Sequence, residues 1–361
     1  MSDILLLIVD ARYPSALVPP SLINGVHPKP VILVLNKVDL VPPELAAAWK
    51  NYFEKKFTNV NVTYFTSCPA YNLLMASGDS SRFFRKLRGK ISMAKEGALQ
   101  IYQLVQQIVG DEVDLSSWKE KIDNFSLEEG CEETPVKDSS LTLGMIGYPN
   151  AGKSSLINSL VGRRVVSVSK TPGHTKHFQT IFISHAVRLC DCPGLVFPST
   201  VPRPFQVVLG SFPISQTREP YSVVQLLAER LDLPSILKLE QKADKWTTYD
   251  LCEAWAYKRG YVTARSNRPD IARAANHIMR MALEGKLTLC LRPPGYRKAD
   301  WQGHPDTVII KDLLALDKIG GEIIEEEIKE ESDSDSEQSV IEEEEEALTV
   351  AKNKFSVLDV E

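Results

Sequence analysis

Residues 147–154 read GYPNAGKS, a stretch that fits the pattern GxxxxGK[ST] and follows directly on the apolar run Leu141–Gly147. Glycines in such a loop allow backbone N–H groups to wrap around phosphates, and the helix expected after the loop turns its N-terminus towards them. The lysine would reach the β- and γ-phosphates, and the serine hydroxyl would bind Mg²⁺. The stretch therefore predicts a phosphate-binding loop between a strand and a helix, the alternative being a chance glycine-rich turn.

Every residue of this loop is a candidate for phosphate binding, through its backbone or its side chain. Lys153 is also a candidate for catalysis, because its ammonium would lie beside the transferred phosphate. The predicted phosphate-binding residues are Gly147, Tyr148, Pro149, Asn150, Ala151, Gly152, Lys153, Ser154 and Ser155.

A second motif stands at the end of the next suitable apolar run, where residues 191–194 read DCPG and fit DxxG. Asp191 would hold magnesium through a water molecule, and the Gly194 N–H would sense the γ-phosphate, which makes Gly194 a catalytic candidate. DxxG alone is a weak signal, but its place after the phosphate loop strengthens it. Leu195 follows where a Ras-like protein has the glutamine that orients the attacking water. We therefore expect slow intrinsic hydrolysis of the nucleotide.

A third motif, NKVD at residues 36–39, ends the apolar run Val31–Asn36. The Asp39 carboxylate could accept from the N1–H and the 2-amino group of guanine together, and adenine presents no such pair of donors. Lys37 would lie along the base, and Asn36 would brace the base site against the phosphate loop. The backbone after the next strand suits contact with the guanine O6. The predicted guanine-binding residues are Asn36, Lys37, Asp39, Ser67 and Cys68.

The order of the motifs is unusual, because in ordinary small GTPases the phosphate loop and DxxG precede NKxD. The series NKVD, TSCPA, GYPNAGKSS and DCPG resembles the circularly permuted GTPases linked to ribosome assembly. The opening strand with its DAR turn at residues 10–12 and the segment TPGHTK at residues 171–176 resemble the same family. Residues 213–216, 252–256 and 293–296 look like the C-terminal region of its guanine nucleotide-binding protein-like branch.

The resemblance implies further roles and partners. Thr175 would lie in switch I, where it would act in catalysis and bind Mg²⁺ with Ser154 and Asp191. Asn150 stands where related loops place a ligand for K⁺, although it could instead only stabilise the turn. GTP and GDP are the expected nucleotides, and a pre-ribosomal particle or ribosomal RNA is the expected partner, in the nucleus, nucleolus or cytoplasm. The alternative function is a regulatory binding module that loads GTP with negligible turnover and acts on a protein partner, which would bind the C-terminal domain.

The sequence predicts an α/β fold with three parts. We expect a circularly permuted P-loop GTPase domain, a mostly parallel sheet with helices on both faces, over residues 1–200. A mainly helical domain would follow over 201–312 and a disordered acidic tail over 313–361. The predicted strands are Ile4–Asp10, Val31–Asn36, Val62–Thr66, Leu141–Gly147, Thr180–Ser184 and Val187–Asp191. The predicted helices are Leu45–Phe57, Lys95–Val109, Ser154–Val161, Val223–Leu231, Asp250–Arg259 and Asp270–Glu284, and residues 111–140 are expected to form a polar joint.

Charge divides the chain unevenly. Residues 321–361 carry 16 acidic and 3 basic side chains, whereas the rest carries an excess of basic ones, although the net charge of the whole is −5. A basic body favours a polyanionic partner, and the tail could screen it or serve solubility alone. The tail also offers acidophilic kinases three serines with an acidic residue three positions on, namely Ser332, Ser334 and Ser339.

Other patterns bound the function. The six cysteines show no zinc spacing and are typical of a reduced, intracellular protein, and no signal peptide or membrane span is expected. The pair Phe83–Phe84 among basic residues could stack on RNA or form a solvated basic loop. His174 is a minor candidate for catalysis. Relatives carry a basic extension before the first strand, so this chain is expected to be a short form or to have an incomplete start.

Overall fold

The structure is a computed structural model that describes most of the chain. For residues 81–92 and 356–359 it describes the backbone alone. Across the described parts, no helix combines the length and the apolar character that crossing a membrane requires. The described residues are 2–66, 81–123, 141–161, 165–166, 178–184, 186–195, 201–240, 246–263, 267–315 and 356–359.

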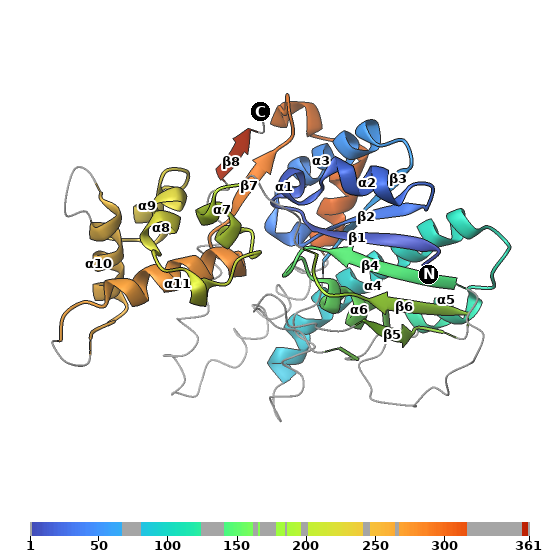
Figure 1. Ribbon diagram of the computed structural model, residues 1–361, viewed down its shortest axis with the longest axis horizontal. Helices are drawn as coiled ribbons and strands as arrows, with labels where there is room; N and C mark the ends of the chain where they lie inside the picture. Colours follow the sequence, from blue (N-terminus) through green and yellow to red (C-terminus); the bar gives the residue numbers. More distant parts are fainter. Residues whose placement is uncertain are drawn as a thin grey trace, which may run out of the picture. The chain divides into compact units, whose positions relative to one another are not determined.

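A six-stranded sheet forms the centre of the first half of the chain, in the order β3-β2-β1-β4-β6-β5 (Figure 1). Every neighbouring pair is parallel except β5 and β6, which are antiparallel. The predicted mostly parallel sheet is therefore confirmed, and four of the six predicted strands have the predicted bounds. The strands are β1 (Ile4–Asp10), β2 (Val31–Asn36), β3 (Val60–Phe65), β4 (Leu141–Gly147), β5 (Gln179–Phe182) and β6 (Val187–Asp191).

Two layers of helices enclose this sheet. The helices α4 (Ser81–Val109), α5 (Ser116–Asp123) and α6 (Lys153–Val161) share one apolar cluster with side chains of β1, β2, β4 and β6. Another group of helices lies between β1 and β3 in the sequence, and its first member contacts β1 and its last member contacts β3. Because both faces are covered, β1 and β2 are buried along their whole length, as their unbroken apolar runs indicate. The elements of that group are α1 (Pro14–Leu17), α2 (Pro20–Val26), η1 (Val38–Leu40) and α3 (Pro43–Lys56).

The joint between β3 and β4 differs from the prediction. The chain leaves β3 at one edge of the sheet and returns to its middle in β4, and α4 and α5 lie between the two strands in the sequence. A polar joint was expected over residues 111–140, but residues 116–123 form α5. Leu115, Trp118 and Ile122 are buried in the core cluster, and this spacing gives a short helix one apolar face. Residues 124–140 lie outside the described part.

Residues 201–292 are mainly helical, and local capping explains where two of the helices begin. Thr247 and Asp250 form a reciprocal capping box at the start of α10. The Asp270 side chain accepts from the Arg273 N–H at the start of α11, and Gly285 ends this helix with a φ of 81°. The elements are α7 (Arg203–Val208), η3 (Ile214–Gln216), α8 (Tyr221–Ala228), α9 (Leu233–Ile236), α10 (Thr248–Lys258), α11 (Ile271–Glu284) and β7 (Leu289–Arg292).

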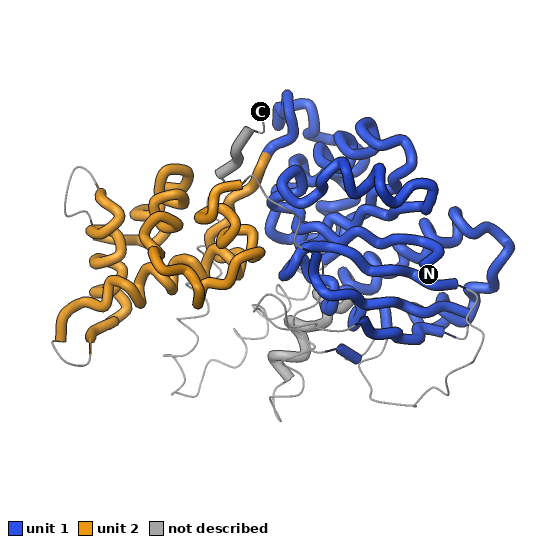
Figure 2. The backbone as a smooth tube through the Cα atoms, viewed as in Figure 1, with its two compact units in different colours: residues 1–196, 292–334, 360–361 blue, residues 197–291, 335–359 orange. Residues whose placement is uncertain are grey.

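The chain divides into two compact units (Figure 2). Unit 1 holds Met1–Val196 and Arg292–Ser334 with Val360–Glu361, and unit 2 holds Phe197–Leu291 with Asp335–Asp359. The predicted boundaries at residues 200 and 312 stay predictions. Within unit 1, two ion pairs connect residues 305–315 to α3. Lys50 Nζ lies 2.6 Å from Asp306 Oδ1, and Lys311 Nζ lies 3.1 Å from Glu44 Oε1.

Three further elements follow in the sequence. Residues 305–315 are helical, and β8 pairs with β7 in a two-stranded sheet. The bounds are η4 (Lys298–Trp301) and β8 (Ser356–Asp359).

Candidate nucleotide-binding site

The three motifs meet at one edge of the sheet. The strands β1, β2, β4 and β6 run parallel, and they end at Asp10, Asn36, Gly147 and Asp191. Asp10 of β1 stands in register with Asn36 of β2, and Ile8 of β1 stands in register with Gly147 of β4. Carboxyl ends of parallel strands are where such sheets bind ligands. The base-reading motif and the phosphate loop are therefore brought together, although more than 100 residues separate them in the sequence.

Backbone conformation shapes the phosphate loop. Asn150 has a φ of 60° and Gly152 a φ of 99°, so the chain turns sharply before α6 begins at Lys153. A Cβ atom on Gly147 would run into the backbone oxygen of Ile8, so this position requires glycine. After glycine, Asn tolerates a left-handed conformation best, which agrees with the alternative that Asn150 stabilises the turn. The first N–H groups of α6 face the loop and suit an anion.

Lys153 is buried beneath this loop. Its Nζ donates to the backbone oxygens of Gly147 at 3.0 Å and Tyr148 at 2.9 Å. Burial lowers the pKa of this lysine, while the negative charge of Asp191 works in the opposite direction. The ammonium is thus held at the loop by backbone dipoles, in the place where the motif predicts a phosphate contact.

Asp191, at the end of β6, is 1% exposed. Both of its carboxylate oxygens are buried without a well-formed hydrogen bond to any described residue. Burial raises its pKa, although the Lys153 charge and the neighbouring Cys192 N–H favour the ionised form. Burial also raises the pKa of the Cys192 thiol, to about 11, and this thiol donates to the Met145 backbone oxygen at 2.7 Å. Asp191 therefore offers two buried carboxylate oxygens that a cation or a water molecule could contact.

The rest of the DxxG segment lies against the phosphate loop. The Leu195 N–H donates to the Gly147 oxygen at 3.1 Å. A Cβ atom on Gly194 would come within 2.8 Å of the Pro149 nitrogen, so only glycine allows this approach. Leu195 is 38% exposed. The backbone of this segment is thus close to the loop, while the side chain at the position of the Ras-like glutamine is apolar.

At the base end, side chains link the two motifs directly. The Asn36 amide donates to the Ala151 backbone oxygen at 2.7 Å, and its oxygen accepts from the Lys37 N–H at 2.8 Å. Lys37 has a φ of 62°, and its Nζ donates to the Asn150 backbone oxygen at 2.8 Å. Asp39 is exposed and accepts from the buried Thr66 hydroxyl at 2.7 Å, which orients its carboxylate. The contact expected between Asn36 and the phosphate loop is present.

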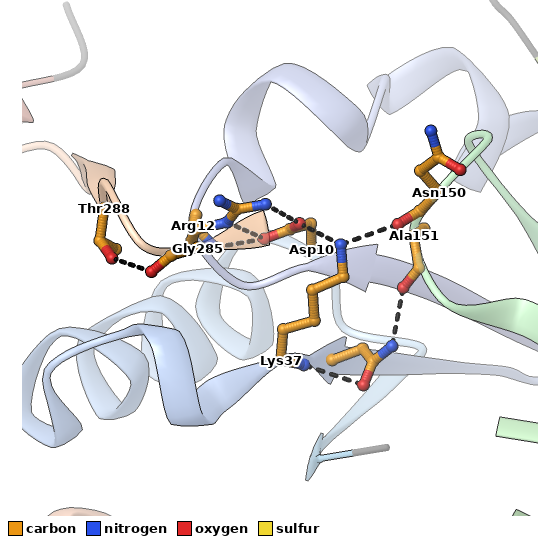
Figure 3. A network of polar contacts seen from close by, with 8 residues as sticks. Asp10, Arg12, Lys37, Asn150, Ala151, Gly285 and Thr288 are labelled. Carbon is orange, nitrogen blue, oxygen red and sulfur yellow. Dashed lines mark hydrogen bonds and ion pairs between the residues drawn. The ribbon is translucent and has the colours of Figure 1, made fainter. Parts of the chain in front are cut away.

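A buried charge network lies beside the base end and was not predicted (Figure 3). Asp10 accepts from the Arg12 Nε at 3.0 Å and Nη2 at 2.9 Å, and from the Lys37 Nζ at 2.8 Å. Burial acts to raise the pKa of Asp10, but the charges and hydrogen bonds of Arg12 and Lys37 hold it well below the ordinary value. In the sequence, the DAR turn carries only a resemblance to the family. The signal that could have predicted the network is the pair of charged residues that follows a run of six apolar ones.

For the other predicted site residues, the structure gives the burial alone or no description. Ser154 and Ser155 stand half-buried in the first turn of α6, and Tyr148 is buried in the loop. Among the described residues, no three or more His, Cys, Asp or Glu side chains stand together so that they could hold a metal ion. The candidates outside the described residues are Ser67, Cys68, Thr175, His174, Ser332, Ser334 and Ser339. The side chains of Phe83 and Phe84 are likewise not described.

Known proteins resemble the chain in sequence and in fold. A model of the family described as 50S ribosome-binding GTPase matches residues 142–247. Guanine nucleotide-binding protein-like 1 of Homo sapiens is 43% identical over 350 residues, which cover 85% of this chain and 58% of that protein. Large subunit GTPase 1 of Saccharomyces cerevisiae is 33% identical over 342 residues, covering 88% of this chain and 52% of that protein. The chain thus spans a little over half the length of these relatives.

Solved structures are also similar over most of the chain. The GNP-bound structure of YlqF from T. maritima is 20% identical to it, covers 78% of this chain and 88% of its own, and gives a TM-score of 0.43.

Proposed function

The chain is a circularly permuted GTPase-family protein that is homologous over most of its length to guanine nucleotide-binding protein-like 1, and from this we propose that it binds GTP and GDP and hydrolyses GTP slowly. The fold is that of a P-loop GTPase domain, with the strand of the base-reading motif placed before the phosphate-loop strand in the chain. The two nucleotide states would act as a switch on a partner.

One observation carries the nucleotide proposal. The base-reading motif bonds to the phosphate loop twice, from Asn36 to the Ala151 oxygen and from Lys37 to the Asn150 oxygen. A single ligand that holds guanine at one end and phosphates at the other would span the two motifs. The exposed Asp39 carboxylate, oriented by Thr66, offers the double acceptor that distinguishes guanine from adenine.

The phosphate end suits Mg²⁺. Asp191 has two buried carboxylate oxygens without hydrogen bonds, and Ser154 stands at the start of α6 on the same edge of the sheet. Magnesium is held by few protein ligands together with phosphate oxygens and water, so it requires no cluster of carboxylates, and the described residues of this site contain none. When bound, the ion would neutralise charge between the β- and γ-phosphates. By resemblance Thr175 would complete the set.

Slow hydrolysis follows from Leu195, because a leucine cannot orient the attacking water. Acceleration would then come from K⁺ held near Asn150, or from a group that a partner supplies. The same leucine favours the second candidate function, a regulatory module that loads GTP, turns over negligibly and acts on a protein partner of unit 2.

A pre-ribosomal particle or ribosomal RNA is the partner that we infer. The matched family is described as a 50S ribosome-binding GTPase, and the yeast relative is named Large subunit GTPase 1. The excess of basic side chains outside residues 321–361 suits a polyanion. The protein would then work in the nucleus, including the nucleolus, or in the cytoplasm, and an acidophilic kinase would act on the tail.

Two measurements test these proposals. Equilibrium binding should show tight binding of GTP and GDP, weak binding of ATP, and a requirement for Mg²⁺ in GTP binding. Turnover in potassium, with and without ribosomal subunits, should rise when subunits are added if the protein is a switch in subunit assembly. Negligible turnover under both conditions would favour the regulatory module, and equal affinity for GTP and ATP would contradict the assignment of the base site.

A further inference from the structure

Asp10 occupies the centre of the site edge. It is the last residue of β1, and β1 lies between β2, which ends in the base-reading motif, and β4, which ends in the phosphate loop. Its side chain is 3% exposed. A carboxylate buried this deeply is stable only with charged or hydrogen-bonding partners. Asp10 has two such partners, and they come from different parts of the chain.

Arg12 is the first partner, and it holds the carboxylate from two directions. Its Nε bonds Oδ1 at 3.0 Å and its Nη2 bonds Oδ2 at 2.9 Å, and its backbone N–H also donates to Oδ1 at 3.1 Å. The guanidinium side chain is itself 2% exposed. A planar fork of this kind leaves the carboxylate one orientation. Arg12 therefore fixes where the remaining negative charge of Asp10 points.

Lys37 is the second partner, and it is the residue through which Asp10 would act. Its Nζ bonds Asp10 Oδ2 at 2.8 Å and the Asn150 backbone oxygen at 2.8 Å (Figure 3). A flexible lysine chain carries about 2 kcal/mol of rotamer entropy, so two acceptors are needed to hold its head in one place. The carboxylate and the loop oxygen together hold the ammonium across the boundary between the two motifs.

We propose that Asp10, oriented by Arg12, is a positioning residue that holds the Lys37 ammonium against the phosphate loop and thereby couples guanine binding to phosphate binding. The inference rests on the proposed function, since it concerns the affinity of the same nucleotide site. The side-chain hydrogen bonds of Asp10 run to Arg12 and Lys37, and neither residue belongs to the phosphate loop. Its contribution to nucleotide affinity passes through Lys37 alone.

A second aspartate, at the amino end of β1, provides the control. Asp3, just before the strand begins, accepts from the Thr142 N–H at 2.7 Å and so ties β1's start to β4. It lies at the amino end of the strand, opposite the site edge. A purely structural contribution of Asp10 should resemble that of Asp3, whereas a positioning contribution should depend on Lys37.

The test is a double-mutant cycle on the whole chain. Dissociation of fluorescent methylanthraniloyl-GDP would be followed in wild type, Asp10→Asn, Lys37→Met and the double variant, with Asp3→Asn as the control. Asp10→Asn should speed dissociation about tenfold, because a neutral amide holds the ammonium weakly. In the Lys37→Met background the same change should alter the rate by less than about twofold. Asp3→Asn should lower the free energy of unfolding and leave dissociation unchanged.

Other outcomes overturn the inference. Acceleration by the same factor with and without Lys37 would assign Asp10 a general structural role, and an unchanged rate in Asp10→Asn would remove its role altogether. If Asp10→Asn does not fold, Arg12→Lys replaces it, because this variant keeps the charge and loses the fork. Arg12→Lys should speed dissociation only while Lys37 is present. Wild type that fails to bind GDP would defeat the proposed function, whereas binding without coupling would defeat this inference alone.

Discussion

The two ends of the nucleotide site differ in how their polar groups are satisfied. At the base end, the side chains of Asn36, Lys37 and Asp39 all take part in hydrogen bonds within the protein. At the phosphate end, both oxygens of Asp191 are buried without a well-formed bond of this kind to the described residues, and Lys153 donates to two backbone oxygens of the loop. The base end is thus organised before a nucleotide binds, whereas the phosphate end holds charge that a cation and phosphates would satisfy.

Asp10 and Asp191 show this difference within one residue type. Both are buried at the carboxyl ends of strands of the same sheet, Asp10 on β1 and Asp191 on β6, with β4 between the two strands. Burial acts to raise both pKa values, but Arg12 and Lys37 overcome it at Asp10, and Lys153 does not at Asp191. With two cationic partners the buried Asp10 carboxylate is stabilised within the protein, whereas with one partner the Asp191 carboxylate is left able to bind a cation.

The largest expected effect is at the phosphate end. Lys153→Ala should weaken Mg²⁺-dependent GTP binding by about 4 kcal/mol, because it removes a buried cation that would contact phosphate. Isothermal titration with GTP and Mg²⁺ would measure the loss. Lys29→Ala is a suitable control, since Lys29 donates to the Ser2 oxygen at an exposed position. Unchanged affinity in Lys153→Ala would mean that this loop does not bind phosphate.

Opposite changes in stability should separate the two aspartates. Without nucleotide, Asp10→Asn should lower the free energy of unfolding by about 3 kcal/mol, because it leaves Arg12 buried without its counter-charge. Asp191→Asn should leave the stability unchanged or raise it, because it removes a buried charge that has no hydrogen bond. Urea unfolding at pH 7 would measure both. A similar loss in the two variants would show that the ends of the site do not differ.

At the base end, Asp39→Asn should abolish the preference for guanine. Replacing the double acceptor by an amide should cost about 2–3 kcal/mol of GDP affinity. Xanthine has an oxygen where guanine has its 2-amino group, so the variant should bind xanthosine diphosphate better than wild type does. Competition binding with both diphosphates measures the change. Wild-type GDP affinity in Asp39→Asn would refute the assignment of the NKVD motif.

The charge network predicts a dependence on pH. Because the pKa of Asp10 is lower in the folded chain than its ordinary value of 3.8, the unfolded chain binds more protons between the two values. The stability that Asp10 contributes is therefore complete above pH 3.8 and falls as the pH drops further, by about 1.4 kcal/mol per unit. The stability difference between wild type and Asp10→Asn should shrink in this range. Unfolding curves between pH 7 and pH 3 would show it, and a constant difference would contradict the ion pair.

The smallest expected effect concerns catalysis at the phosphate end. If K⁺ binds near Asn150, hydrolysis should be several-fold faster in potassium than in sodium, a difference of about 1 kcal/mol in the barrier. Asn150→Ala should remove the difference with little change in GDP affinity, and Leu195→Gln should not restore Ras-like turnover. Asn61→Ala, at an exposed position of β3, is the matched control. Equal rates in both salts would shift the role to a partner.

Much of unit 1 could be predicted from the order of the residues. The strands β1, β2, β4 and β6 have the predicted bounds, because each is a largely apolar run that ends at a residue of a motif. The helix α5 was not predicted, because Leu115, Trp118 and Ile122 stand among charged residues and show their apolar face only against α4 and the sheet. A helix this short has too few turns for a helical repeat of apolar residues to be recognised among the surrounding polar ones.

Local sequence thus determined the motifs, their permuted order and the chemistry that each motif offers. Only the tertiary structure decided which side chains those motifs meet. Asp10 and Lys37 are 27 residues apart, and Asn36 and Ala151 are 115 apart, so their contacts depend on the pairing of β1 with β2 and β4. The opposite pKa shifts of Asp10 and Asp191 depend on these contacts as well. Charge interactions depend on the distance between the side chains in space, and the register of the strands sets that distance, whereas the separation in sequence does not.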